Sequence, residues 1–405
     1  MICLRVIAAR LTAAASLAAL MACSDSTGPA GGAEFWEYDP ALRGLTGAVD
    51  VVLSPDLIRV TTFGGTTHAV LEPGSGREKF RISTSEGGSL YRAGPVVVLY
   101  TQTGLDSAAS RVYDAESGRA LFTVPSHPLA RVFLGTAGSV LVSSLGDSLL
   151  IGNDRSSGVE IWRRQVAGVA CTTFCGAFAR VDAIGDELLL TRFTNLASYF
   201  IRVTQAGSVT VVPTSRDAFR FASTPLYGRR ASSTAPVVVA TSSGVTSLDP
   251  TTGATIWRTL YESLVPTGYY SLASSYNVTQ DGAWVTARML DSAGTAAEPA
   301  REIIVNANDG SRARERLFPG ESGIELLRGA CATSGQVRVL SDLRLEFVDV
   351  PTGRSSRSDP IPALDWLRTI LTTGGFYRNT ALITGRHIIV HDQFAQKVRG
   401  VRCAI

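Results

Sequence analysis

Short runs of Val, Leu and Ile recur along most of the chain, and clusters of Gly, Asp and Ser separate them. Examples are Val96–Leu99, Val140–Val142, Val237–Val239 and His387–Val390. Apolar runs of this length between turn-forming residues are typical of short β-strands. Helix-forming patterns are scarce, and Pro362–Thr372 is the one good candidate for a helical turn or two. The pattern therefore predicts an all-β protein.

A repeated turn sequence follows many of these runs. It consists of an acid, Ser or Thr three residues later, Gly at the fourth place and Phe or Trp at the eighth. The six intervals from Gly76 to Gly353 span 277 residues, or about 46 each, which is the length of a four-stranded propeller blade. Weaker copies centre on Gly207, Gly310 and Gly353, and a last one at His391–Phe394 has lost its glycine. The four strong copies are Glu72-Ser75-Gly76-Phe80, Asp114-Ser117-Gly118-Phe122, Asp154-Ser157-Gly158-Trp162 and Asp249-Thr252-Gly253-Trp257.

Each part of the repeated turn has a physical role in a hairpin. The carboxylate can accept hydrogen bonds from backbone N–H groups two residues later, and glycine supplies the positive φ that the turn needs. The aromatic residue then lies on the outgoing strand, where we expect it to fill the space between neighbouring blades.

The segment Leu248–Trp257 resembles the D-x-x-T-G-x-x-x-W signature of the PQQ-like propeller repeat. Quinoprotein dehydrogenases carry this repeat, as does the outer-membrane assembly lipoprotein BamB. The resemblance extends roughly from Gly47 to the C-terminus. It implies one closed β-propeller of four-stranded blades over residues 35–405. Eight turns imply eight blades, and seven remain the alternative if the last turn merely closes the ring. We expect the N-terminal segment Phe35–Val52 to help close the last blade.

The first residues read as a targeting signal. Arg5 and Arg10 give a basic start, and the apolar run Leu11–Met21 has the length of a signal-peptide core and is too short to span a membrane. Leu20–Cys23 resembles the lipobox of bacterial lipoproteins, which implies cleavage before Cys23 and acylation of that residue. We therefore predict a signal peptide over 1–22 and a flexible tether over 23–34. The Ser after the cysteine favours the outer membrane over the inner one, and an ordinary secretory signal is the alternative.

Composition narrows the class of partner. Only 18% of the residues are charged and the formal net charge is +3, which argues against nucleic acid as a partner. No apolar stretch is long enough for a polytopic membrane protein.

The cysteines that remain in the mature chain are four in number, and an even count in an exported chain favours disulfides. Three pairings are open. We favour Cys171–Cys175 together with Cys331–Cys403. A zinc site of four thiols is the alternative, and the spacing of these cysteines suits it poorly.

The sequence gives little evidence for a catalytic, metal or cofactor site. His387 and His391 stand on a predicted strand, where four residues separate them by about 13 Å, so a shared metal is not expected. No G-x-S-x-G motif occurs. The adjacent cysteine pair that marks quinone sites in the resembling dehydrogenases is missing. We therefore predict no catalytic residue, no cofactor and no metal.

Two functions follow from these observations. The resemblance implies a non-catalytic, lipid-anchored scaffold that binds envelope proteins or peptides through loop faces or strand edges, with outer-membrane protein assembly as its role. The alternative is a quinoprotein-type dehydrogenase, or another enzyme acting at the central channel. Specificity is expected in the long connections Ala167–Ala179 and Leu290–Arg301, because loops carry function on rigid scaffolds.

Overall fold

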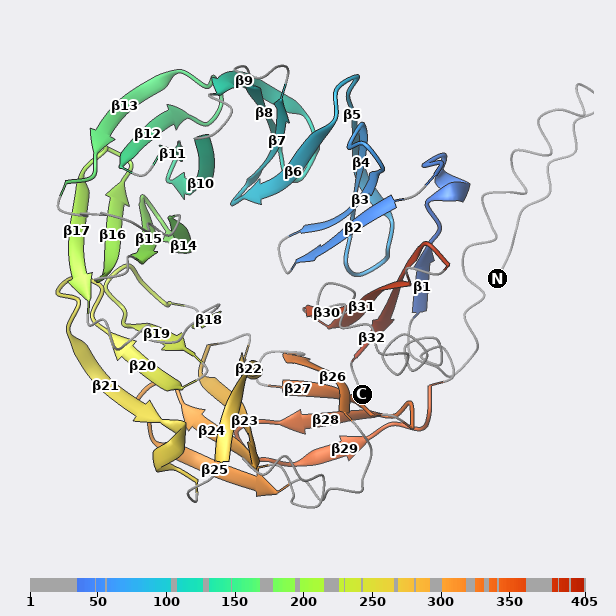
Figure 1. Cartoon of the computed structure of the whole chain (residues 1–405), viewed down its shortest axis with the longest axis vertical. Helices are drawn as coiled ribbons and strands as arrows, with labels where there is room; N and C mark the ends of the chain where they lie inside the picture. Colours follow the sequence, from blue (N-terminus) through green and yellow to red (C-terminus); the bar gives the residue numbers. More distant parts are fainter. Residues whose placement is uncertain are drawn as a thin grey trace, which may run out of the picture.

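Eight antiparallel sheets of four strands each are arranged in a ring, which is an eight-bladed β-propeller (Figure 1). The structure is a computed structural model. It describes residues 35–403 except 48, 55–56, 103–107, 127–130, 147, 168–177, 194–196, 215–225, 229, 242, 266–268, 280–281, 292–300, 318–324, 331–334, 341, 362–380, 385 and 393–394. The predicted all-β fold and the count of eight blades are confirmed. The helical segment predicted at Pro362–Thr372 lies outside the described residues.

The first four blades follow the chain in order. Blade 1 is β2 (Val49–Ser54), β3 (Leu57–Thr62), β4 (Thr67–Leu71) and β5 (Glu78–Ser83). Blade 2 is β6 (Gly88–Ala93), β7 (Val96–Gln102), β8 (Ala108–Asp114) and β9 (Ala120–Ser126). Blade 3 is β10 (Arg131–Ala137), β11 (Val140–Leu145), β12 (Leu149–Asp154) and β13 (Glu160–Gln165). Blade 4 is β14 (Ala179–Ile184), β15 (Glu187–Phe193), β16 (Ser198–Thr204) and β17 (Val209–Thr214).

The remaining blades complete the ring, and the last one takes a strand from the N-terminus. Blade 5 is β18 (Leu226–Tyr227), β19 (Val237–Ala240), β20 (Gly244–Leu248) and β21 (Thr255–Leu260). Blade 6 is β22 (Tyr269–Val278), β23 (Trp284–Asp291), β24 (Arg301–Asn306) and β25 (Arg312–Leu317). Blade 7 is β26 (Glu325–Ala330), β27 (Gly335–Leu340), β28 (Leu345–Asp349) and β29 (Ser355–Arg357). Blade 8 is β30 (Ala381–Thr384), β31 (His387–Asp392), β32 (Lys397–Arg402) and β1 (Phe35–Tyr38).

Ring closure depends on β1, which pairs antiparallel with β32 from Phe35↔Val401 to Tyr38↔Val398. The two ends of the chain are therefore held in one sheet, as predicted for the N-terminal segment. Closure matters because a sheet lacking this strand would expose the unpaired edge of β32.

The last predicted repeat turn is corrected by this topology. Seven repeat turns, from the one at Gly76 to the one at Gly353, join the third and fourth strands of blades 1 to 7. The turn after Asp392 instead joins β31 to β32, which are the second and third strands of blade 8. Blade 8 has no turn of the repeat type because its fourth strand comes from the N-terminus. Seven blades therefore contain a repeat turn, and the eighth is completed by the N-terminal strand β1.

Continuous apolar runs belong to the second strands of the blades. In β7 the four residues Val96–Leu99 are each at most 1% exposed. A strand that is buried on both faces of its sheet loses the alternation of polar and apolar residues. This burial explains why the runs stood out in the sequence.

Strand direction divides the ring into two faces. Because neighbouring strands are antiparallel, the turns between first and second strands and between third and fourth strands lie at the same end; we call this end the turn face. The turns between second and third strands, and the links between blades, lie at the other end, the connection face. The strand β1 begins at the turn face, where Trp36 donates to the Pro73 carbonyl in the β4–β5 turn (3.1 Å).

Two short 3-10 helices, η1 (Ala41–Arg43) and η3 (Tyr261–Ser263), lie on links between blades. In the part of the chain that is described, no helix has the length and apolar character needed to cross a membrane.

Candidate functional site

The repeat turns show how their acids are used. In blade 3 the Asp154 carboxylate accepts from the backbone N–H groups of Ser156 (3.0 Å) and Ser157 (2.8 Å), and Gly158 N–H donates to the Asp154 carbonyl (2.8 Å). Hydrogen bonds from the Ser156 side chain and then from Ser157 lower the pKa of Asp154 to about 2. This carboxylate is therefore ionised at physiological pH and serves the turn.

The other strong copies have the same backbone closure. The N–H of the turn glycine donates to the carbonyl of the acid at 2.8–2.9 Å in each case. Asp114 and Asp249 also accept two backbone N–H groups each through one carboxylate oxygen, whereas Glu72 accepts from the Ser75 hydroxyl (2.6 Å). The pairs that close in this way are Glu72 and Gly76, Asp114 and Gly118, Asp154 and Gly158, and Asp249 and Gly253.

The repeat aromatics lie against the turn glycines of the following blade. A Cβ atom added to the turn glycine would lie less than 3.0 Å from the aromatic ring of the preceding blade. The tryptophans also donate an indole hydrogen bond into that turn, Trp162 to the Gln205 carbonyl (3.0 Å) and Trp257 to the Asn308 carbonyl (3.2 Å). Glycine is thus required both for its positive φ and for the close approach of the ring. The pairs are Phe80 and Gly118, Phe122 and Gly158, Trp162 and Gly207, and Trp257 and Gly310.

Trp36 makes the same contact at the closure of the ring. Its ring lies over Gly76 of blade 1, and its indole N–H donates to Pro73. Sequence reasoning gave Trp36 no role, because the strand that carries it has no repeat turn before it. The signal that could have identified it is the unfilled aromatic position before the first repeat turn.

A cavity of about 850 Å³ opens in the central channel near the turn face. Residues of the first strands β6, β10, β14, β18 and β22, and of the turns that follow β18 and β22, form its wall. The lining combines apolar side chains with arginines and one carboxylate: Arg92, Leu134, Arg180, Val181, Asp182, Ala183, Ile184, Leu226, Tyr227, Gly228, Arg230, Ala231, Val278 and Thr279.

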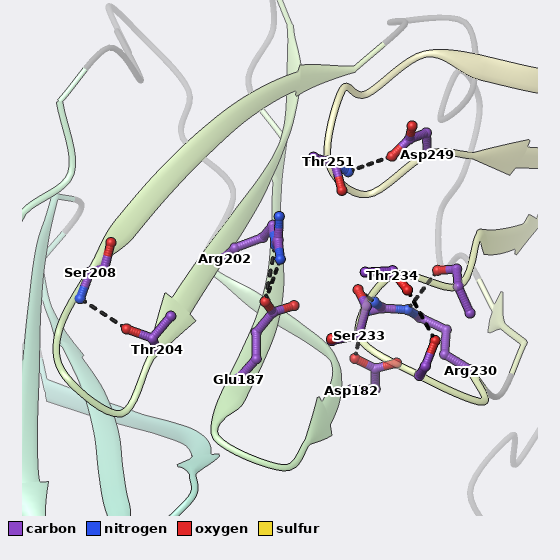
Figure 2. Close-up of polar contacts among 12 residues, drawn as sticks. Asp182, Glu187, Arg202, Thr204, Ser208, Arg230, Ser233, Thr234, Asp249 and Thr251 are labelled. Atoms are coloured by element: carbon purple, nitrogen blue, oxygen red, sulfur yellow. Dashed lines mark hydrogen bonds and ion pairs between the residues drawn. The ribbon is translucent and has the colours of Figure 1, made fainter.

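An ion pair between Asp182 and Arg230 connects blades 4 and 5 in this wall (Figure 2). Arg230 Nη1 donates to Asp182 Oδ1 at 3.0 Å, and the guanidinium also donates to the carbonyls of Ala235 (3.1 Å) and Ser233. The Arg230 side chain is only 1% exposed. These three contacts hold the guanidinium in one position.

The second oxygen of Asp182 is different. Asp182 Oδ2 is buried and has no hydrogen-bond partner among the described residues. Burial, with a smaller contribution from nearby Glu187, raises the pKa of the Asp182 carboxyl above its ordinary value, although the Arg230 and Arg180 charges act to lower it. Glu187 is itself paired with Arg202 at 2.6 Å (Figure 2).

The histidines have structural surroundings. His68 is fully buried with its ring Nδ1 at 3.0 Å from the Thr61 hydroxyl, and burial lowers its pKa to about 4. His387 and His391 lie on β31, on the strand that the sequence predicted. Across the described segments, no group of three or more His, Cys, Asp or Glu side chains could hold a metal ion.

Several predicted positions lie outside the described residues. They are Cys23, Cys171, Cys175 and Cys331, together with most of the connections Ala167–Ala179 and Leu290–Arg301. Cys403 follows β32 and is fully buried. The lipid site and the disulfide pairs therefore stay predictions.

The connection face carries the most exposed large apolar side chains of the described residues. Phe63 in the β3–β4 turn is 88% exposed, and Leu42 in η1 is 83% exposed. They flank blade 1 on opposite sides: η1 links blade 8 to blade 1, whereas the β3–β4 turn lies against the link from blade 1 to blade 2, where Gly88 N–H donates to the Gly65 carbonyl (3.1 Å).

Comparison with known proteins gives a family match and several likenesses of fold. The profile of the family described as outer membrane protein assembly factor BamB matches residues 25–259. BamB from Moraxella catarrhalis has a TM-score of 0.47 at 13% identity, over 92% of this chain and 97% of that one. The WD40 domain of SCAP from fission yeast has a TM-score of 0.49 at 8% identity, over 88% and 95%. The computationally designed Ika8 protein has a TM-score of 0.48 at 13% identity, over 88% and 96%. No curated protein matches the chain.

Proposed function

Because the chain belongs to the family of the outer membrane protein assembly factor BamB, we propose that it is a non-catalytic, lipid-anchored scaffold. It binds protein partners at the bacterial cell envelope and serves the assembly of outer-membrane proteins. The family supplies the role, and the division of the ring into two faces supplies the way in which partners are bound.

The observation that carries the proposal is the exposure of Phe63 and Leu42 on the connection face. Large apolar side chains that project into water from a rigid scaffold mark protein contact sites when they occur together. Both side chains lie on the connection face at the two sides of blade 1, so a partner surface that spans this blade can cover them together. Burying them would remove apolar surface from water, which is the main driving force of protein association.

The position of the N-terminus supports the same face. The strand β1 begins at the turn face, and we infer that the proposed tether over 23–34 connects to the ring from that side. A tether of this length spans at most about 40 Å when extended and about 20 Å on average. Acylation at Cys23 would hold the turn face toward the membrane and leave the connection face open to partners. The strands that flank Ala167–Ala179 and Leu290–Arg301 end and begin at the connection face as well.

A complementation experiment tests the proposal. Cells lacking this gene receive wild type, the Leu42→Glu/Phe63→Glu variant, Cys23→Ala, or a matched control, Val159→Glu/Ile161→Glu. The control replaces two apolar side chains that are 64% and 53% exposed on the outer edge of blade 3. The measurement is the amount of integral outer-membrane proteins at equal cellular levels of each variant.

We expect wild type and the blade 3 control to restore that amount, whereas the connection-face variant fails. Cys23→Ala should move from the membrane fraction to the soluble fraction. Full activity of the connection-face variant, or an equal defect in the control, would contradict binding through Phe63 and Leu42. An unchanged distribution of Cys23→Ala between fractions would refute the lipid anchor.

A further inference from the structure

The loop between β18 and β19 distinguishes blade 5 from its neighbours at the turn face. Two residues join the first and second strands in blades 2, 3 and 4, whereas nine residues, 228–236, separate β18 from β19. Gly228 at the base of this loop, and Arg230 and Ala231 farther along it, line the cavity at the turn-face end of the channel. The loop therefore borders that cavity on the side of blade 5.

The segment 230–236 of this loop is held together by its own hydrogen bonds. The buried Arg230 guanidinium donates to the carbonyls of Ala235 (3.1 Å) and Ser233. The Ala235 N–H in turn donates to the Ser232 carbonyl (3.1 Å). These bonds fold the segment around the arginine side chain, so the segment can move as one unit.

The attachment of this segment to the rest of the ring is slight. Among the described residues, the ion pair of Arg230 with Asp182 of blade 4 (3.0 Å, Figure 2) is the one hydrogen bond or ion pair that ties the segment to another blade. No hydrophobic cluster of the described core includes a residue of the segment, and four of its residues are exposed. Segments with few buried apolar contacts open at a free energy well below that of global unfolding.

The ion pair itself favours the attached position only slightly. The Arg230 side chain is 1% exposed and that of Asp182 is 21% exposed, and the loss of hydration offsets most of the attraction between two buried charges. Nearby Glu187 also repels the Asp182 carboxylate more than Arg180 attracts it. Detachment returns both charges to water, so the attached and detached positions of the segment lie close in free energy.

We propose that the segment 230–236 is a lid at the turn-face end of the channel, and that the Asp182–Arg230 ion pair holds the lid closed. In the closed position the lid forms part of the cavity wall. When the pair breaks, the lid moves away from blade 4 about Gly228, whose N–H remains bonded to the Val238 carbonyl (2.9 Å). The cavity of about 850 Å³ then widens on this side. The lid thus controls how large a molecule can enter the channel from the turn face.

Hydrogen exchange followed by mass spectrometry on the purified full chain tests the proposal. In wild type, the amides of the lid should exchange at least about tenfold faster than those of β19 and β20, because the lid opens without unfolding of the blade. Asp182→Asn should speed exchange of the lid by at least about a further tenfold, since the Arg230 charge would be buried without a counter-charge in the closed position. Exchange in β19 and β20 should stay the same. Glu187→Gln is the matched control, because the Glu187–Arg202 pair lies in blade 4 and does not tie the lid.

Spin labels report the position of the lid directly. One label is attached at Thr234→Cys on the lid and the other at Asp186→Cys in the exposed β14–β15 turn of blade 4, and the chain without these two changes, labelled in parallel, gives the background. Asp182→Asn should increase the population with the longer distance between the labels, and Glu187→Gln should leave it unchanged.

Three results would each overturn the proposal. They are a wild-type lid that exchanges no faster than β19 and β20, an effect of Asp182→Asn that is absent from the lid or equal in all blades, and a distance distribution that Asp182→Asn does not change. The first of these is measured on wild type, so it stands even if a variant fails to fold. None of them bears on the connection face, so the proposed function is tested separately.

Discussion

Replacing Gly158 by alanine should destabilise the ring far more than replacing Gly146, although both glycines have positive φ in turns of blade 3. The φ of Gly158 is +76° and that of Gly146 is +59°. A Cβ at Gly158 would lie less than 3.0 Å from the Phe122 ring of blade 2, whereas one at Gly146 would have no atom within 4 Å. The pair therefore separates the cost of backbone conformation from the cost of contact between blades.

The expected magnitudes follow from these two costs. An alanine in the left-handed region costs about 1–2 kcal/mol, and this applies to both variants. Displacing a well-packed ring adds about 1–3 kcal/mol for Gly158→Ala alone. The loss of unfolded-state freedom on replacing glycine, about 0.4–1 kcal/mol, is common to both and cancels in the comparison. We expect Gly158→Ala to lower the free energy of unfolding by about 1–3 kcal/mol more than Gly146→Ala does.

Urea unfolding followed by circular dichroism measures this difference. Phe122→Leu provides the second arm of a double-mutant cycle, because a smaller side chain relieves the contact with a Cβ at position 158. Gly158→Ala should therefore cost less in the Phe122→Leu background than in wild type. Equal destabilisation by the two glycine variants, or no coupling with Phe122, would refute the account of how neighbouring blades pack.

Three further predictions concern the closure, the buried charges and the response to pH. Trp36→Ala should lower the free energy of unfolding by about 2–4 kcal/mol, since a packed indole at the ring closure is lost; a urea midpoint equal to wild type would contradict this. Arg338 is fully buried between Glu302 and Glu346, so Arg338→Met should cost about 3–5 kcal/mol at pH 7 because it removes the buried cation that compensates these two carboxylates; an unfolding midpoint in urea equal to wild type would contradict this. The folded pKa of His68 is about 4 against an ordinary 6.5, so the unfolded chain binds the proton first and stability should fall as pH drops from 6.5 toward 4. His68→Gln should flatten that part of the stability–pH curve, and an unchanged slope would contradict the assignment.

The sequence predicted the features that depend on local residues. Four copies of an acid, a glycine and an aromatic at fixed spacing predicted turns such as Asp154–Gly158, and together with the three weaker copies they gave the blade length. Closure by the N-terminal strand also followed from the need to cover a sheet edge.

Features that depend on contacts between residues far apart in the sequence could not be predicted from local patterns. Trp36 packs on Gly76, forty residues later, and donates to a turn of another blade. The Asp182–Arg230 pair forms because β14 and β18 lie side by side in the channel wall. Neither contact produces a local sequence pattern, because the residue that each side chain contacts lies on a different blade. The turn after Asp392 was misassigned for the same reason, since its place in the blade depends on where β1 pairs.

Photo-crosslinking in living cells tests the central claim of partner binding through the connection face most directly. A crosslinking amino acid is placed at Phe63 on the connection face or at Arg77 in the repeat turn of the same blade, whose side chain is 82% exposed. We predict that position 63 forms adducts with proteins of outer-membrane assembly and that position 77 does not. Adducts from position 77 alone, or none from position 63, would contradict the claim.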